Sequence, residues 1–205
     1  MQARAALFFR QRSTHRSISC QRPACGRSRF SRLWMLSLLL SACATQPAHG
    51  PLPLAPAVDL DRFMGDWYVI ANIPTFLERD AYHAIERYER AADGSIATTF
   101  TFRKGAADGP LKTYHPRGFV RDTATNAVWG MQFVWPIKAD YRILYVSPDY
   151  RYTIIGREKR DYAWVMARTS VIPDADLADL INRLVAAGYD RGAIRQVPQP
   201  ALDPM

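Results

Sequence analysis

The chain contains no cysteine after residue 43. Its three cysteines are Cys20, Cys25 and Cys43. A domain without cysteine has no disulfide framework, and it has no thiolate with which to bind a metal. Both kinds of site are therefore excluded for the larger part of the chain.

That part of the chain also lacks an excess of charge. The 205-residue chain has a formal net charge of +8, from 27 basic and 19 acidic residues. Its first 43 residues hold eight arginines and no acidic residue, which leaves 19 basic residues to balance the 19 acidic ones. Because nucleic-acid binding needs a basic surface on the folded domain, this balance argues against nucleic acid as a partner.

The apolar run near the start of the chain is too short to cross a membrane. It covers residues 33–40, LWMLSLLL, whereas a transmembrane helix needs about 20 apolar residues. A cluster of arginines precedes it and small residues follow, which is the order of a signal peptide. A short buried helix is the alternative, and the arginines before it disfavour that reading because they would lack partners. The sequence therefore predicts a signal peptide over residues 1–42.

The end of this leader, Leu40-Ser41-Ala42-Cys43, resembles the bacterial lipobox. In that motif the cysteine is lipidated through its sulfur and becomes the first residue after cleavage. The resemblance predicts a lipid on Cys43, and Ala44 in place of an aspartate implies the outer membrane. The alternative is ordinary cleavage near Ala42 or Ala48, with Cys43 incidental.

The remainder divides into a tether, one domain and a tail. Residues 43–57 include four prolines and predict an extended tether. A single domain is expected over 58–198, and residues 199–205 look like a loose tail. Short segments rich in β-branched and aromatic residues alternate with turn signals such as Asp93-Gly94, and they predict an all-β sandwich or barrel. Eight strands are expected, at about 66–73, 82–91, 95–104, 111–121, 127–135, 140–146, 151–157 and 162–169.

One helix is expected late in the domain. Asp174 is the predicted cap, and Gly188 suits the C-terminal stop. The apolar residues between them recur at helical spacing and form a single stripe that needs a surface to lie on. The outside of the sheet would serve, and a short strand at about 193–197 follows.

The domain has little of what an enzyme needs. Its histidines, His83 and His115, show no metal-ligand spacing, and neither a Gly-x-Ser-x-Gly elbow nor a glycine-rich phosphate loop is present. Glu86 and Glu89 lie near His83 on opposite faces of a strand, so they form no carboxylate pair. The sequence predicts a binding protein rather than an enzyme, with no catalytic residue, no cofactor and no metal.

Three motifs resemble the lipocalin family. They are Gly65-Asp66-Trp67 at the start of the first strand, Asp149-Tyr150 after Ser147-Pro148, and Arg168 at the end of the eighth strand. The stretch 67–71, the turn 160–162 and the lipobox resemble the bacterial outer-membrane branch. The resemblance covers about residues 58–198. One departure is the Ser-Pro-Asp-Tyr turn, where the family usually has a threonine.

The resemblance implies an eight-stranded antiparallel up-and-down β-barrel with the C-terminal α-helix packed outside. Gly65, Trp67 and Arg168 are then structural residues of the closed end. Gly65 allows a sharp turn into the strand. Trp67 plugs the base, and Arg168 lies over its indole.

The open end implies a ligand site. The candidate lining is Met131, Phe133, Trp135, Tyr141 and Trp164, with Arg142 or Lys138 near a polar headgroup. The resemblance implies a carrier or store of fatty acids or lysophospholipids, lipid-anchored to the bacterial outer membrane and facing the periplasm. Two alternatives stay open: a structural or interaction lipoprotein whose aromatics fill the barrel, and, less favoured, a lipid-processing enzyme. Monomer and homodimer are both compatible with the sequence.

Overall fold

The structure is a computed structural model, and it describes residues 49–200. The predicted signal peptide, Cys43 and most of the predicted tail lie outside these residues. Within the described residues, no helix has both the length and the apolar character that crossing a membrane requires.

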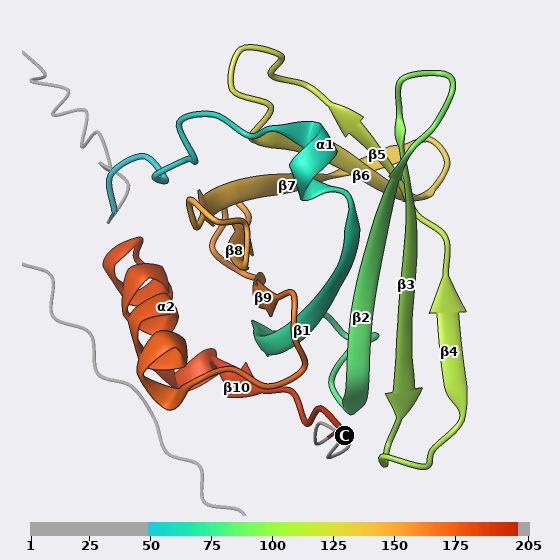
Figure 1. Cartoon of the computed structure of the whole chain (residues 1–205), viewed down its shortest axis with the longest axis vertical. Helices are drawn as coiled ribbons and strands as arrows, with labels where there is room; N and C mark the ends of the chain where they lie inside the picture. The colour runs from blue at the N-terminus through green and yellow to red at the C-terminus, as the bar shows by residue number, and fades with distance from the viewer. Residues whose placement is uncertain (1–48, 201–205) are drawn as a thin grey trace, which may run out of the picture. The chain divides into compact units, whose positions relative to one another are not determined.

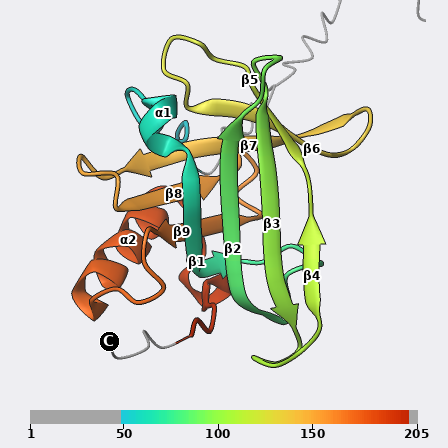
Figure 2. The ribbon, with the colours of Figure 1, turned by 45° about the vertical axis from the view of Figure 1, so that its right-hand side comes forward.

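The described chain folds into a closed antiparallel β-barrel (Figures 1 and 2). The strands follow the order β10-β1-β2-β3-β5-β6-β7-β8-β9, β4 pairs with β3 alone, and β1 closes the barrel against β9, with Tyr68 opposite Ala167. This confirms the predicted fold class. The elements are α1 (Leu60–Phe63), β1 (Gly65–Ile73), β2 (Ala81–Arg90), β3 (Ile96–Lys104), β4 (Leu111–Tyr114), β5 (Arg117–Val120), β6 (Val128–Val134), β7 (Ile137–Val146), β8 (Tyr152–Gly156), β9 (Ala163–Ala167), α2 (Asp174–Ala186), the 3₁₀ turn η1 (Arg191–Ala193) and β10 (Arg195–Gln196).

The fourth predicted strand is broken into two. β4 pairs with the end of β3, whereas β5 pairs with the start of β3 and with β6. His115 and Pro116 separate them. Proline has no N–H to donate to a sheet ladder, so a continuous strand through Pro116 would lose a bond. Counting β4 and β5 as one strand gives the expected eight, with β10 added along the edge of β1.

Helix α2 lies on the outside of the barrel, as predicted (Figure 1). Its buried residues Leu177, Leu180 and Leu184 belong to a cluster formed with the outer faces of β1, β8 and β9. The expected cap is wrong: Pro173 is the N-cap and Asp174 is the first helical residue, with no side-chain cap bond. Gly188 follows the helix with φ +91°, which suits the C-terminal stop.

The closed half of the barrel interior is packed solid with aromatic rings. Phe63 from α1 lies 5.2 Å from Trp67 of β1 and 5.6 Å from Trp129 of β6, measured between ring centroids. The Trp129 ring is in turn 5.6 Å from that of Tyr141, which lies 6.3 Å from that of Trp164. Phe63, Trp67 and Trp129 are fully buried. This column of rings leads from the closed end towards the other half of the barrel.

Candidate ligand-binding site

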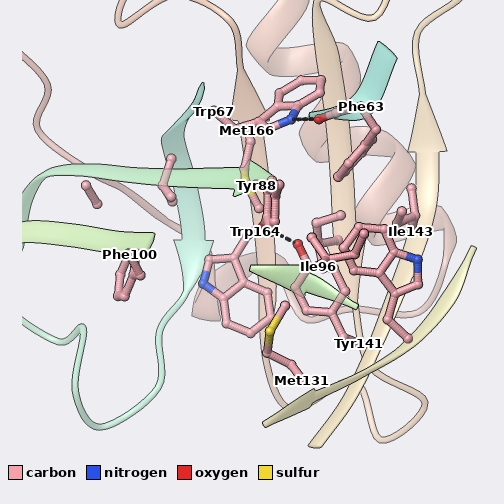
Figure 3. Close-up of a cluster of buried hydrophobic side chains, with 14 of the residues drawn as sticks. Phe63, Trp67, Tyr88, Ile96, Phe100, Met131, Tyr141, Ile143, Trp164 and Met166 are labelled. Atoms are coloured by element: carbon pink, nitrogen blue, oxygen red, sulfur yellow. Dashed lines mark hydrogen bonds between the residues drawn. The ribbon is translucent and has the colours of Figure 1, made fainter. Parts of the chain in front are cut away.

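The closed end is built around Trp67 and Arg168. Trp67 is fully buried, and its indole N–H donates to the carbonyl of Phe63 at 2.8 Å (Figure 3). The Arg168 guanidinium lies 3.7 Å from the centre of the Trp67 ring. Its nitrogens donate to the carbonyls of Asp66 and Met64 at 2.7 and 2.9 Å, and to that of Arg62 at 2.7 Å. The cation is therefore stacked and hydrogen-bonded, which offsets the cost of taking it out of water.

Gly65 stands where the chain turns from α1 into β1. Its φ of +92° lies in the left-handed region that disfavours side chains. A Cβ at this position would also stand 3.4 Å from Nη1 of Arg168. The glycine therefore permits both the turn and the close approach of the guanidinium.

The Asp149-Tyr150 turn meets the same end of the barrel. The hydroxyl of Tyr150 accepts the N–H of Asp59, which caps α1, and the Arg62 guanidinium lies 4.1 Å from the Tyr150 ring centre. Ser147 Oγ accepts the N–H of Tyr152 at 2.9 Å and donates to Asp149. The three sequence motifs thus converge on α1.

The other half of the interior holds a cavity of about 540 Å³. It lies beyond Tyr141, between the β1–β2 loop and the open ends of the strands. In Figure 3, Trp164, Tyr141 and Met131 lie on one side of the aromatic cluster, and Trp67 and Phe63 lie on the other. The interior is therefore neither wholly filled nor wholly hollow: one half is core and the other half is pocket.

Four of the five predicted lining residues border this cavity. They are Met131, Phe133, Tyr141 and Trp164. Trp135 does not border it and is 82% exposed. Its expected position followed from strict alternation along residues 129–135, but the pairing of β6 with β7 shifts register between Met131 and Val134. Such an irregularity changes the face that later residues present.

A buried carboxyl group, Glu86 of β2, faces the cavity. It accepts a hydrogen bond from the Tyr88 hydroxyl, which is also 2.6 Å from the hydroxyl of Tyr141. Burial, and secondarily the negative charge of Glu78, raises the pKa of Glu86 to about 8. Glu86 is therefore protonated at neutral pH, and burial raises the pKa of Tyr141 well above its ordinary value.

A second carboxylate, Glu78, comes from the β1–β2 loop and is 5% exposed. One of its oxygens accepts the indole N–H of Trp164 at 2.7 Å. The other oxygen accepts the N–H and the hydroxyl of Thr75, at 3.0 and 2.6 Å. These bonds hold the loop against the inner face of β9 at one side of the cavity.

The basic residue at the cavity is Arg157, at the end of β8. Its side chain is 20% exposed, and its Nε is buried without a hydrogen-bond partner. Its Nη1 lies 3.3 Å from Asp161. The predicted headgroup residues lie elsewhere: Arg142 pairs with Asp140 and Glu158, and Lys138 lies over the Phe119 ring.

The sequence reasoning missed Glu78, Glu86 and Arg157. A signal existed for Glu86, because Ala84, Glu86 and Tyr88 alternate along one face of β2 and all three are buried. Glu86 and Glu89 lie on opposite faces of β2, as expected, with Glu86 buried and Glu89 exposed. The charged neighbour of Glu86 is Glu78, which stands in a loop and has no strand pattern to reveal it.

Comparisons with known proteins agree with this architecture. A model of the lipocalin-like domain matches residues 58–199. The chain is 26% identical over 165 residues to temperature-induced lipocalin-1 of Arabidopsis thaliana, covering 75% of this chain and 86% of that protein. It is 23% identical over 166 residues to outer membrane lipoprotein Blc of Escherichia coli K12, covering 80% and 92% respectively.

Solved structures show the same fold. Lobster apocrustacyanin A1 superimposes with a TM-score of 0.55 at 13% identity, covering 76% of this chain and 93% of that one. Insecticyanin from the tobacco hornworm Manduca sexta superimposes with a TM-score of 0.56 at 17% identity, covering 74% and 85%. At such identities the likeness concerns the fold alone. The match of the domain model to most of the chain, with the barrel and its closed end, shows that this protein belongs to the lipocalin family.

Proposed function

We propose that this lipocalin binds one small apolar ligand, of the fatty acid or lysophospholipid class, in the open half of its barrel. The observation that carries the proposal is the cavity of about 540 Å³, bordered by Phe100, Met131 and Trp164 among others. Small-ligand pockets usually enclose about 300–1,000 Å³ and are mostly apolar, with a few polar groups that orient the ligand. The cavity has these features.

Burial of an acyl chain supplies enough free energy for useful affinity. A chain of about 15 methylenes gains on the order of 12 kcal/mol when it leaves water. Association and ordering cost several kcal/mol of this gain. The remainder corresponds to a dissociation constant in the micromolar range or below.

The charges suggest which end of the ligand enters first. Glu78 and Glu86 are buried along the cavity wall. An anionic head placed next to them would be repelled by the charge of Glu78. It would also compete for the hydrogen bonds that Trp164 and Thr75 donate to Glu78. Arg157 borders the same cavity with a free Nε. We therefore place the acyl tail towards Tyr141 and the carboxylate or phosphate at Arg157.

The proposed location is the periplasmic side of the bacterial outer membrane, with a lipid on Cys43. Support comes from the lipobox-like sequence 40–43 and from the name of the Escherichia coli relative, an outer membrane lipoprotein. Ordinary cleavage would leave Cys43 unmodified. Mass measurement of the N-terminal peptide from membranes separates the two, because lipidation adds the mass of its acyl chains to the cysteine.

One observation bears on the enzyme alternative. Glu78 and Glu86 face one cavity, and burial raises the pKa of Glu86 to about 8, so that a protonated carboxyl group near a second acidic residue could serve acid–base chemistry. Both groups are already engaged, by Trp164 and Thr75 and by Tyr88, so we favour a structural and orienting role. Release of labelled fatty acid from lysophospholipid over hours of incubation would reverse that preference.

Titration with a fluorescent fatty acid tests the proposal. Ala139 borders the cavity, so Ala139→Trp should fill part of it and weaken binding by about tenfold or more. Ala124→Trp is the matched control, because Ala124 is exposed in the β5–β6 turn at the other end. Near-ultraviolet circular dichroism and thermal melting of both variants confirm that the barrel is intact. Equal binding by the wild type and Ala139→Trp would rule out the cavity as the site.

A further inference from the structure

Large apolar side chains are exposed on the hairpin that joins β6 and β7. Phe133 is 51% exposed, Val134 67%, Trp135 82% and Ile137 69%. With Pro136 and Lys138 they form an unbroken exposed stretch, residues 133–138. In Figure 2 this hairpin projects from the right-hand side of the barrel, away from α1 at the closed end.

This exposed stretch belongs to the mouth of the cavity. Phe133, Val134 and Ile137 also border the cavity, as does Phe76 of the β1–β2 loop, which is 74% exposed. We call residues 133–138 together with Phe76 the apolar rim. Outside the rim, the large apolar residues recorded as exposed in the 49–200 range are Leu111 and Val171. The apolar exposure is therefore concentrated where a ligand would enter.

Exposure of this kind needs a partner. Contiguous apolar surface on a soluble domain marks an interaction site, and runs of exposed apolar residues are otherwise avoided. Two partners fit a rim of this shape: a lipid bilayer, and a second copy of the chain. Three observations favour the bilayer.

The first observation is where the described chain begins. Arg160, in the turn between β8 and β9, donates to the carbonyl of Gly50 at 2.6 Å. The same turn carries Arg157 and Tyr162, which border the cavity, so Gly50 lies towards the mouth. Six residues, 44–49, separate it from Cys43, and the seven steps along the chain can span at most about 25 Å. A lipid on Cys43 would hold Gly50, beside the turn that borders the cavity, within that distance of the membrane; this step rests on the proposed function.

The second observation is the chemistry of the rim. Trp135, the most exposed of these residues, is the side chain type that settles at membrane–water interfaces, where its apolar ring and its N–H are both satisfied.

The third observation is the positive charge beside the rim. Lys138 follows Ile137 in the hairpin, with its Nζ 3.6 Å from the Phe119 ring centre, and Arg79 lies in the same β1–β2 loop as Phe76. Both are exposed, and neither forms an ion pair with any residue in 49–200. Basic residues in this position attract anionic lipid headgroups.

We infer that the apolar rim inserts into the headgroup region of a lipid bilayer, so that the mouth of the barrel opens directly onto the membrane. An apolar ligand then passes between bilayer and cavity along Phe76, Phe133 and Ile137 without crossing water. The rim acts as the contact that aligns the barrel, and the N-terminal lipid keeps it close.

Vesicle binding tests the inference without the lipid anchor. The chain of residues 44–205, which lacks both the predicted signal peptide and the cysteine that would be lipidated, is mixed with vesicles of phosphatidylethanolamine and phosphatidylglycerol and floated on a density gradient. Trp135→Ser in this background should lower vesicle affinity by about tenfold, because the variant lacks the large apolar side chain that the bilayer would bury. Val171→Ser is the matched control: Val171 is 49% exposed after β9 and lies outside the rim. It should leave the affinity unchanged.

Two further measurements make the result decisive. Brominated acyl chains should quench part of the tryptophan emission of the 44–205 chain, and this part should disappear in Trp135→Ser. Light scattering in the absence of vesicles measures association between copies. Two results would overturn the inference: a dimer in the parent chain that becomes a monomer in Trp135→Ser, or a vesicle affinity that Trp135→Ser leaves unchanged.

Fatty-acid titration of the same variants separates this inference from the proposed function. Trp135 does not border the cavity, so Trp135→Ser should keep the wild-type affinity for a fatty acid in solution. If the parent chain without the Trp135 substitution binds the fatty acid normally but does not bind vesicles, the rim inference is wrong and the carrier proposal is unaffected. If the parent chain binds vesicles but does not bind the fatty acid, the carrier proposal is wrong and the rim inference is unaffected.

Discussion

Arg168 covers Trp67 at the closed end of the barrel, with its guanidinium carbon 3.7 Å from the centre of the indole ring. The two residues come from strands that meet where the barrel closes, β1 and the end of β9. Arg168 also binds the carbonyls of the turn that leads from α1 into β1. One side chain therefore ties the helix, the first strand and the last strand together.

Loss of this arginine should destabilise the barrel. Arg168→Met keeps some apolar contact with Trp67 but leaves the carbonyls of Arg62, Met64 and Asp66 without their donor. We expect a loss of about 2–4 kcal/mol in the free energy of unfolding, measured by urea denaturation. Arg151→Met is the control, because Arg151 is exposed at the same end and should change stability by about 0.5 kcal/mol or less. Similar losses for both variants would contradict the assigned role of Arg168.

The buried carboxyl of Glu86 should make the free energy of unfolding fall as pH rises from about 4.5 to 8. Its pKa is raised from an ordinary value of 4.5 to about 8 by burial. Between these values the folded protein keeps a proton that the unfolded chain has lost. The stabilisation is therefore complete below about pH 4.5 and is lost as pH rises towards 8, by at most about 1.4 kcal/mol per unit.

Glu86→Gln isolates this effect, since the amide cannot ionise and can still accept from Tyr88. The variant should match the wild type near pH 5 and become increasingly more stable than it up to pH 8, in paired urea titrations. Neighbouring hydrogen bonds lower the pKa values of Asp66 and Asp149 below 3.8. Their contribution to stability therefore changes only at more acid pH and is constant between pH 5 and 8. A stability difference that stays constant from pH 5 to 8 would show that Glu86 is ionised in the folded protein.

Arg157 should recognise the head of the ligand and not its tail. Arg157→Gln is expected to weaken binding of a fatty acid by about tenfold, the usual value of a hydrogen bond between charged groups. Binding of the fatty alcohol of equal chain length should change little, and the ratio of the two affinities is the readout. Arg142→Gln serves as the control, because Arg142 is paired with Asp140 and Glu158 and does not border the cavity. Equal effects of Arg157→Gln on acid and alcohol would remove Arg157 from the head site.

The barrel and the elements of its closed end could be anticipated from the sequence because their signals are local. Alternation of apolar residues marks each strand, and the short motifs around Trp67, Tyr150 and Arg168 stand at strand ends. The break at Pro116 was also visible in principle, since a proline inside a predicted strand is itself a warning. The N-cap prediction for Asp174 is wrong by one residue, because aspartate is favoured both at the N-cap and in the first turn, and the sequence does not distinguish these adjacent positions.

The rest of the site depends on contacts that no local pattern records. Glu78 is buried because Trp164, 86 residues further along the chain, donates to it. Trp135 lies outside the cavity because β6 ends at Val134, after a register shift in its pairing with β7, and Trp135 falls in the turn that follows; neither feature can be read from one strand alone. Arg157 faces the cavity from a strand end, where a charged residue is usually solvated.

Photo-crosslinking tests the central claim, that one apolar chain occupies the open half of the barrel with its tail inward. A fatty acid with a diazirine at its terminal carbon would be bound to the protein, irradiated and mapped by peptide mass spectrometry. With the tail inward, adducts are expected on the inner residues Phe100, Met131, Tyr141 or Trp164. Labelling confined to the groove between α2 and the barrel, or to the rim, would contradict it.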